Sequence, residues 1–316
     1  MTLGEKMRAS GVPLCLGTMH FGTSIDEPTA GRLLDHFVEA GGTVIDTANC
    51  YGTWVGSGAE SEEVVGKWLR SGTSRDRVVV ATKIGLRHDT SMQPWPSQEE
   101  GLSAKAVRQA TEDSLRRLCA ERIDLLYAHI DDRAVPLEET VSAFAELARE
   151  GLVGRLGLSN YQTARVECAR AIAEENDWPR ADCLQYRYTY LRPRPGVFFG
   201  GQLPAGQDLL DYVAANPDLT LFGYSPLLSG AYSRPDRPLL PHYHDPGNAA
   251  RLAALAEVAR EIGVTVNQVV LAWMIGGMPS VLPVIGVSTV EQLDECLAAG
   301  NLKLSEEHRA RLDTAG

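Results

Sequence analysis

The sequence predicts an α/β fold in which eight strands and their helices form one closed (β/α)8 barrel, a TIM barrel. Apolar runs typical of buried strands alternate with segments of helical periodicity along the whole chain. Three of these runs end on a chemically active side chain, namely Asp46, Lys83 and His129. An α/β barrel builds one site from reactive residues at the carboxyl ends of successive parallel strands. We therefore expect these three side chains to be neighbours.

Length and composition favour a single soluble domain. The chain has 316 residues, a length that α/β barrels reach as one domain, and no composition break divides it. We therefore expect one barrel domain over residues 1–316. The net charge of −11 disfavours a nucleic-acid partner.

Cysteine usage and hydropathy indicate the cellular compartment in which the protein is expected. The six cysteines are scattered without metal-binding spacing, which indicates a reducing environment. No apolar segment of signal length begins the chain, and no run of roughly 18 apolar residues occurs. We expect a cytoplasmic protein without a membrane span.

The first half of the chain supplies four strands. The first is expected over 14–17, and a helix follows from about Glu27 to Ala40 with Asp26 as its N-cap. After the second strand, over 43–46, Ser57 and Glu60 have the spacing of a capping box. The further elements are expected in this order: strand 78–83, a polar loop through Trp95, helix 104–118 and strand 123–129.

The second half supplies the other four strands. A helix ending at Gly151 precedes strand 153–158, and a helix through Ala173 precedes a strand that ends at Gln185. The last two strands are expected over 219–224 and 281–285. Thr265 with Gln268, and Thr289 with Gln292, are expected to cap the last two helices. The long loops 192–207 and 225–248, after strands six and seven, are candidate lids.

Tyr51 follows Asp46 in a glycine-rich loop and completes a candidate catalytic group. A phenol is a weak acid at neutral pH until a nearby cation such as Lys83 stabilises its anion. A buried lysine needs a counter-ion, which Asp46 can supply. His129 can hydrogen-bond a substrate oxygen. These groups suit protonation of a carbonyl oxygen by Tyr51 while hydride arrives at the carbon.

Several segments together resemble the aldo-keto reductase superfamily. They are Leu16–Gly22, the spacing of five from Asp46 to Tyr51, Ala81–Lys83, Asp124–His129, Gly157–Tyr161, Gln185, Tyr224–Leu227 and Glu291–Glu295. The resemblance implies a (β/α)8 barrel that reduces aldehydes and ketones with NADPH and without a metal. It also implies that Asp46, Tyr51, Lys83 and His129 are the catalytic tetrad.

The same resemblance implies a binding site for the nicotinamide cofactor. Ser159, Asn160 and Gln185 match the residues that hold the carboxamide, and Tyr224 matches the aromatic residue that stacks on the ring. Backbone close to the nicotinamide is expected at Gly17, Thr18 and Met19. The loop that crosses the pyrophosphate is expected to use Ser225, Leu227, Ser229 and Gly230. The sequence has no G-x-G-x-x-G after a strand, which excludes a separate Rossmann domain.

The chain departs from the family where the 2′-phosphate of NADP(H) binds. Many members have a Lys or Arg after the eighth strand, whereas this chain has the uncharged Ser288 and Gln292. Arg234 and Arg237, after the seventh strand, are candidate replacements for that charge. The adenine-contacting Glu-Asn pair becomes Glu295-Cys296. We expect NADP(H), with NAD(H) as the alternative.

The substrate is expected to be a small molecule with a carbonyl group, such as a sugar, bound between aromatic side chains. Trp54, Trp95 and Tyr190 are candidates for lining that pocket. His242 and His244 lack the partners of a metal site, so we expect no metal. The substrate itself, the physiological direction and the oligomeric state are left open by the sequence.

Three alternatives to a reductase stay open. The first is an NAD-dependent sugar or alcohol dehydrogenase that uses the same site. The second is a barrel lyase in which Lys83 forms a Schiff base. The third is a nicotinamide-binding regulatory subunit without turnover, because the superfamily includes channel β subunits.

Overall fold

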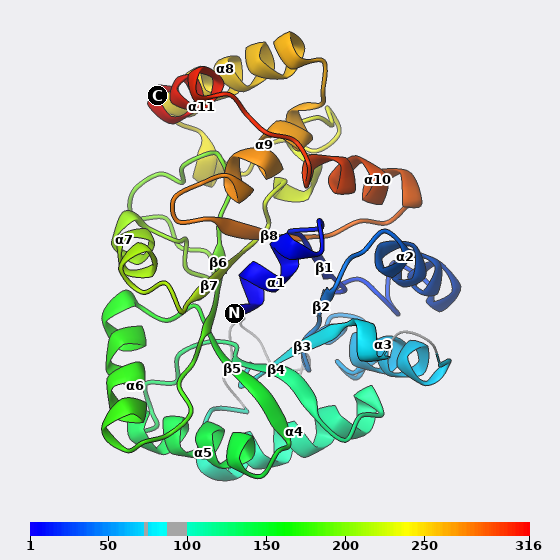
Figure 1. The fold of residues 1–316 in the computed structure, drawn as a ribbon, viewed down its shortest axis with the longest axis vertical. Helices are drawn as coiled ribbons and strands as arrows, with labels where there is room; N and C mark the ends of the chain where they lie inside the picture. Colours follow the sequence, from blue (N-terminus) through cyan, green and yellow to red (C-terminus); the bar gives the residue numbers. More distant parts are fainter. Residues whose placement is uncertain (73–74, 87–99) are drawn as a thin grey trace.

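A closed barrel of eight parallel strands is the centre of the computed structural model, which describes residues 1–72, 75–86 and 100–316 (Figure 1). The strands pair in sequence order and β8 pairs with β1. Their bounds are β1 (Cys15–Gly17), β2 (Val44–Asp46), β3 (Val79–Ile84), β4 (Ile123–Ala128), β5 (Val153–Ser159), β6 (Cys183–Arg187), β7 (Thr220–Tyr224) and β8 (Val281–Ile285). The predicted fold class is confirmed.

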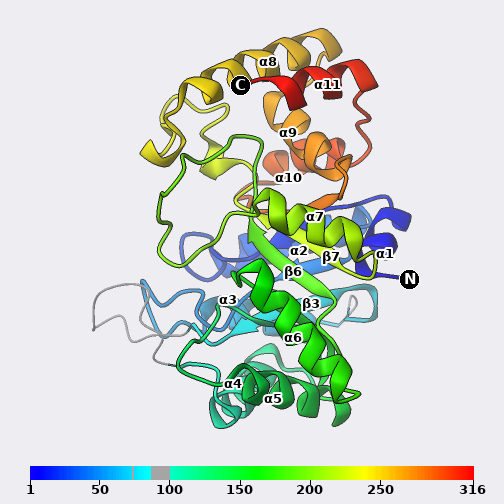
Figure 2. The same ribbon diagram turned by 90° about the vertical axis from the view of Figure 1, so that its left-hand side faces the viewer.

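Most of the helices surround the barrel and cover its outer face, and α1 lies across one end of it (Figures 1 and 2). They are α1 (Leu3–Ala9), α2 (Glu27–Glu39), α3 (Glu60–Arg70), α4 (Ala104–Leu118), α5 (Leu137–Arg149), α6 (Thr163–Glu175), α7 (Gln207–Ala215), α8 (Pro246–Ile262), α9 (Val266–Ile275), α10 (Val290–Ala299) and α11 (Glu306–Thr314). Short 3₁₀ turns lie at Arg75–Arg77, Leu228–Gly230 and Pro241–Tyr243. The main apolar core lies between the sheet and these helices.

Most of the predicted caps are present. Asp26 accepts a hydrogen bond from the Thr29 amide at the start of α2. Thr265 and Gln268 form a complete capping box on α9, which satisfies two amides that the first helical turn leaves unpaired. Thr289 caps α10 by accepting from the Gln292 amide.

The capping box predicted at Ser57 and Glu60 is only half present. The Glu60 carboxylate accepts from the Ser57 amide at 2.7 Å, but α3 begins at Glu60 itself and its N-cap is Ala59. The Ser57 hydroxyl accepts from the Ala59 amide instead of the Glu60 amide. Glu60 thus folds back onto the loop that carries Tyr51, where its carboxylate lies against Gly52 and Gly56.

The sequence patterns did not predict α1, α7 or α11, so the helix at Thr289 is not the last. The seven-residue α1 is too short for a periodic pattern to identify it. It closes the end of the barrel at which the strands begin: Leu3 and Met7 pack with the inward side chains of the strands. The Gly4 amide donates to the Thr220 hydroxyl at 3.1 Å, at the start of β7.

Alternation along the strands decides which residues face the barrel interior. Successive side chains of a strand point to opposite faces, so residues two apart share a face. On β6, Cys183 belongs to the inner apolar cluster, and Gln185 points inward as well, because its amide reaches Asp46 on β2. The inward row therefore changes from apolar to polar toward the carboxyl ends of the strands.

The two long loops after β6 and β7 are present, and they are joined to each other (Figure 2). The Arg194 amide donates to the His242 carbonyl at 2.8 Å. The Asn248 side-chain amide donates to the carbonyls of Arg192 and Tyr243 at 2.7 and 2.9 Å. The loops therefore form one connected wall beside the mouth of the barrel.

Candidate active site

Lys83 connects two of the predicted catalytic residues at the mouth of the barrel. Its ammonium donates to Asp46 Oδ2 at 2.5 Å, to the Thr47 carbonyl at 2.8 Å and to the Tyr51 hydroxyl oxygen at 3.2 Å. Asp46 and Lys83 are 2% and 1% exposed, so this ion pair is almost fully removed from water. An isolated charge at this depth would be costly, and the pairing makes its burial possible.

Burial and charge act in opposite directions on Tyr51 and Lys83. Burial raises the pKa of Tyr51 to about 12, although the neighbouring Lys83 charge lowers it. Burial also disfavours the Lys83 ammonium, but the Asp46 carboxylate and Tyr51 outweigh it and raise the pKa of Lys83. Tyr51 thus keeps its proton at neutral pH. Because Lys83 donates to the Tyr51 oxygen, the phenolic hydrogen is directed elsewhere.

His129 follows β4 and stands beside Tyr51. The two rings meet edge to face with 6.1 Å between their centroids. Burial, assisted by the Lys83 charge, lowers the pKa of His129 well below its ordinary value, which keeps the imidazole neutral. Its Nδ1 lies 3.6 Å from the sulfur of buried Cys50, a contact that the sequence did not indicate. This contact leaves Nε2 as the ring nitrogen available to a substrate oxygen.

The residues expected to hold the carboxamide are arranged in one hydrogen-bonded group at the ends of β5 and β6. Gln185 Nε2 donates to Asp46 Oδ1 at 2.8 Å, which ties this group to the tetrad. The Ser159 hydroxyl donates to the Gln185 carbonyl at 2.8 Å. The Asn160 amide donates to the His129 carbonyl and accepts from the Tyr224 hydroxyl at 2.8 Å. The structure therefore brings the predicted tetrad and amide residues together.

The loop after β7 has an unusual backbone. Ser225, Leu228 and Ser229 have positive φ angles of 56°, 49° and 58°, a region that non-glycine residues rarely adopt. Gly230 continues this run with φ 92°. Backbone strain of this kind is concentrated at ligand-binding sites. Leu227, with φ −104° and ψ 11°, precedes the left-handed Leu228, and a right-handed residue followed by a left-handed one can form a concave nest of amides that binds anions. Leu227 and Ser229 lie in this loop as predicted.

At the end of β1, Gly17 pairs with Asp46 of the neighbouring strand. The Thr18 amide and hydroxyl both donate to the Asp46 carbonyl, at 2.9 and 3.0 Å, so that Thr18 is buried. Met19 is 44% exposed at the mouth. Of these three predicted residues, Met19 thus presents the most open surface.

The residues predicted near the 2′-phosphate are mostly engaged with one another. Ser288 donates through its amide and hydroxyl to Gln292 Oε1 at 2.8 and 3.0 Å. Glu295 accepts from Thr265 and Asn267. Arg234 forms a 2.6 Å ion pair with Asp236, whose carboxylate is also 3.9 Å from Arg237. One carboxylate therefore partly neutralises the two arginines that were expected to supply positive charge.

The three candidate substrate-pocket residues have different outcomes. Trp54 is 47% exposed at the mouth, and its ring meets that of His20 edge to face at 6.1 Å. Tyr190 is fully buried: it packs against Trp273 and Arg251, and its hydroxyl donates to the Leu312 carbonyl. The prediction for Tyr190 is therefore wrong, because its ring belongs to the packing beneath α8 and α11. Trp95 lies outside the described residues.

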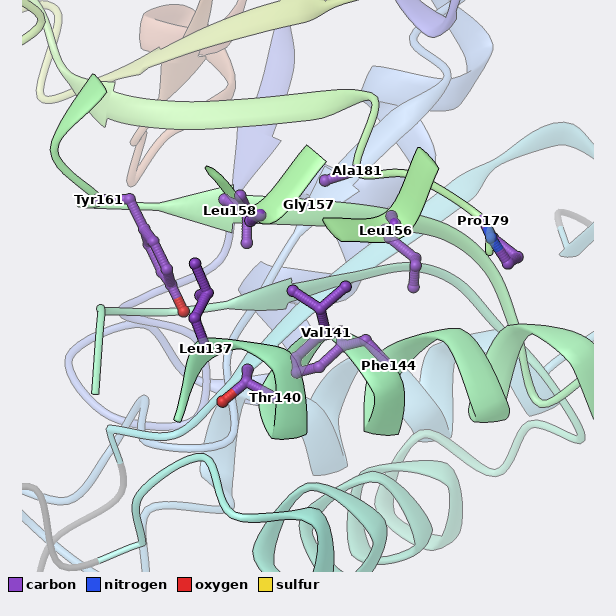
Figure 3. Close-up of a pocket in the computed structure, with 12 residues that line it drawn as sticks. Leu137, Thr140, Val141, Phe144, Leu156, Gly157, Leu158, Tyr161, Pro179 and Ala181 are labelled. Atoms are coloured by element: carbon purple, nitrogen blue, oxygen red, sulfur yellow. The ribbon is translucent and has the colours of Figure 1, made fainter. Parts of the chain in front are cut away.

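A small apolar gap lies elsewhere, between α5, α6 and β5 (Figure 3). Leu137, Val141, Phe144 and Leu156 point into it. This gap is on the outer face of the sheet, away from the tetrad, and offers few polar groups.

The part of the chain that the structure describes has neither a metal-ligand cluster nor a single helix suited to crossing a membrane. It contains no cluster of three or more His, Cys, Asp or Glu side chains that could hold a metal ion. In the same residues no single helix is long and apolar enough to cross a membrane. Only α8 and α9 taken together reach that length and apolar character, and they are bent by 99° relative to each other.

Comparison with known proteins decides the family. The model of the aldo/keto reductase family matches residues 13–316. The chain belongs to the aldo/keto reductase family. It is 34% identical over 298 residues to an uncharacterized oxidoreductase, YrpG, of Bacillus subtilis, an alignment that covers 93% of this chain and 89% of that protein. It is 32% identical to the norsolorinic acid reductase stcV of Emericella nidulans, with 93% and 76% covered.

Solved structures of aldo-keto reductases share the fold. The thermostable Tm1743, solved with the inhibitor epalrestat, aligns with a TM-score of 0.73 and 28% identity over 96% of this chain and 95% of that one. A Klebsiella pneumoniae aldo-keto reductase, solved with NADP and acetate, aligns with a TM-score of 0.72 and 27% identity, covering 96% and 90%. As an aldo/keto reductase, the chain is an NAD(P)H-dependent oxidoreductase.

Proposed function

We propose that this protein reduces an aldehyde or ketone group of a small molecule with NADPH, and that Tyr51 donates the proton. The observation that carries this proposal is the contact of Lys83 with both Asp46 and Tyr51, at 2.5 and 3.2 Å. It supports a protonated phenol held in place by a fixed ammonium, with His129 beside it. NADPH is favoured over NADH because the Klebsiella relative was solved with NADP.

The residues present suit a nicotinamide dinucleotide. The Asn160 and Gln185 amides are held in place by neighbouring side chains and carbonyls, as carboxamide recognition requires. The change from right-handed to left-handed backbone between Leu227 and Leu228 suits a phosphate group. When bound, the cofactor supplies the hydride that passes from nicotinamide C4 to the carbonyl carbon.

The side chains of this chain would donate the proton and orient the substrate. His129 Nε2–H would hydrogen-bond the carbonyl oxygen and fix its direction. Tyr51 would transfer its hydroxyl proton to that oxygen as the carbon gains the hydride, which leaves an alcohol and a tyrosinate beside Lys83. The ammonium stabilises this tyrosinate until the phenol is protonated again.

The alternatives have less support. A Schiff base needs a neutral lysine, whereas Asp46 and Tyr51 raise the pKa of Lys83. A regulatory subunit would not need the hydrogen bonds of Lys83 with Asp46 and Tyr51. Oxidation of a sugar or other alcohol with NAD uses the same residues in reverse, so it differs from the proposal in direction and cofactor and not in site.

Cofactor titration followed by a turnover assay tests the proposal. NADPH and NADH are titrated into the purified protein while tryptophan fluorescence is followed, and NADPH oxidation is then measured with 4-nitrobenzaldehyde. We expect tighter binding of NADPH and aldehyde-dependent oxidation. Preferential NADH binding would favour the dehydrogenase, whereas tight NADPH binding without turnover on any aldehyde would favour the regulatory subunit. Failure to bind either cofactor would reject the proposal.

A further inference from the structure

Arg187 is an inward-facing cation at the mouth of the barrel that the proposed mechanism does not use. It lies two residues after Gln185 on β6 and therefore shares its face. In the strand register it pairs with Tyr224, and its guanidinium carbon lies 5.7 Å from the centroid of the Tyr224 ring. Arg187 is therefore adjacent to the place where the nicotinamide is expected.

The Arg187 charge has no acidic partner in the described part of the chain. Its Nε and Nη2 donate to a neutral acceptor, Gln202 Oε1, at 3.2 and 2.6 Å. Its guanidinium carbon also lies 4.6 Å from the centroid of the Phe199 ring. Among these residues no carboxylate is within ion-pair distance of Arg187. The Arg187 side chain is therefore held in position, and its guanidinium has N–H groups left to bind a ligand.

Tyr243 supplies a second, independent observation beside Arg187. It is 1% exposed, and apart from the adjacent Arg187 guanidinium no described residue offers its buried hydroxyl a hydrogen bond. A guanidinium can only donate, so the phenolic hydrogen has no acceptor among the described residues. A buried donor without an acceptor is costly, and native proteins rarely keep one unless a ligand or water completes it. Burial raises the pKa of this phenol, and the adjacent Arg187 guanidinium opposes the shift. Tyr243 is therefore a neutral donor next to an unpaired cation.

Both long loops hold these groups in place. Phe199 in the first loop stacks on His242 of the second, with 4.6 Å between the ring centroids. His242 in turn hydrogen-bonds the Phe198 carbonyl at 3.3 Å. Arg187 and Tyr243 therefore lie beside the wall that the two joined loops form at the mouth of the barrel, among side chains that are held in place.

We propose that Arg187 and Tyr243 form an anion-binding subsite, and that the substrate is a carbonyl compound which also carries a carboxylate or phosphate group. A guanidinium and a phenolic hydroxyl are donors only toward such a group, and hydrogen bonds between charged partners are the strong ones. On a chain with net charge −11, recognition of an anion needs a local cation of this kind. This inference rests on the proposed reductase function.

The position favours an anion of the substrate over one of the cofactor. The residues expected to contact cofactor phosphates follow β7 and β8, whereas Arg187 is on β6. Its neighbours Phe199 and Tyr243 belong to the loop wall and not to the Ser225–Gly230 segment. A cofactor phosphate shares the same chemistry, so the experiment must separate the two sources.

The test compares matched substrates of similar shape with and without charge. The pairs are 4-carboxybenzaldehyde with methyl 4-formylbenzoate, and glyceraldehyde 3-phosphate with glyceraldehyde. We expect a lower KM for the anionic member of at least one pair, and Arg187→Met to raise that KM about tenfold or more. The KM of the neutral member and the NADPH dissociation constant should stay unchanged. Arg194→Met, an exposed charge in the same loop, is the control and should preserve the preference.

Tyr243→Phe keeps the test informative if Arg187→Met fails to fold, because it removes only one hydroxyl and leaves the ring and the Arg187 charge in place. It should raise the KM of the anionic member several-fold and spare the neutral one. No preference in the wild type, or a preference that both variants retain, would overturn the subsite. Loss of NADPH affinity with the preference intact would assign the anion to the cofactor and also overturn it. Absence of turnover on every aldehyde would instead reject the reductase function.

Discussion

The ammonium of Lys83 lies 2.5 Å from the Asp46 carboxylate, and both side chains are almost fully removed from solvent. Breaking such a pair from one side leaves the other charge buried and uncompensated. Asp46→Asn should therefore reduce the free energy of unfolding by about 3–5 kcal/mol, measured by urea denaturation. Combining it with Lys83→Met should restore part of that loss.

A surface ion pair provides the control for this prediction. Lys67 and Glu27 are 2.7 Å apart, but each side chain is about half exposed, so Glu27→Gln should leave the urea midpoint almost unchanged. If Asp46→Asn were as stable as the wild type, Lys83 would not depend on Asp46 for its charge.

The buried imidazole of His129 should make the free energy of unfolding depend on pH. Its pKa in the folded protein is lowered by burial and by Lys83, so the unfolded chain binds more protons at this residue below about pH 6.5. Stability contributed by the neutral imidazole is therefore complete above that pH and falls as the pH drops, by at most about 1.4 kcal/mol per pH unit. His129→Asn should reduce the difference between unfolding free energies at pH 7.5 and pH 5.

The same group can be followed directly. Nuclear magnetic resonance signals of the His129 imidazole should show no protonation between pH 8 and pH 5.5. A midpoint near the ordinary histidine value would show that the ring is accessible to water and would contradict the neutral role assigned to it.

The Ser288 position tests where the 2′-phosphate binds. Ser288 is exposed just before α10 and carries no charge, and Arg234, the other candidate for the phosphate, is paired with Asp236. If the phosphate lies at this helix end, Ser288→Lys should tighten NADPH binding about tenfold by adding a charge-assisted contact, and leave NADH binding unchanged. Equal effects on both cofactors, measured by fluorescence titration, would place the 2′-phosphate elsewhere.

The fold, and the meeting of Asp46, Lys83 and His129 at one end of the barrel, were predictable because each depends on a local pattern. Apolar runs ending in Asp46, Lys83 and His129 place these residues at the carboxyl ends of strands, and a barrel brings strand ends together. The caps at Asp26 and Thr265 follow from the side chain and the residue three positions on. These features need no knowledge of packing between distant segments.

Features that depend on distant packing were not predicted. Tyr190 was expected in the pocket, but Trp273 and Arg251 from α9 and α8 bury it. The Cys50 contact with His129 also joins residues far apart in sequence. Arg187 was not predicted either, because the predicted strand ended at Gln185 whereas β6 extends to Arg187.

Turnover by Tyr51→Phe tests the central claim most directly. The variant keeps the ring and removes only the hydroxyl that Lys83 contacts, so NADPH should still bind with nearly wild-type affinity while aldehyde reduction falls at least about 10²-fold. Tyr212→Phe, which removes a hydroxyl on the outer helix α7, is the control and should reduce the aldehyde at the wild-type rate. Reduction by Tyr51→Phe at the wild-type rate would contradict the role of Tyr51 as proton donor.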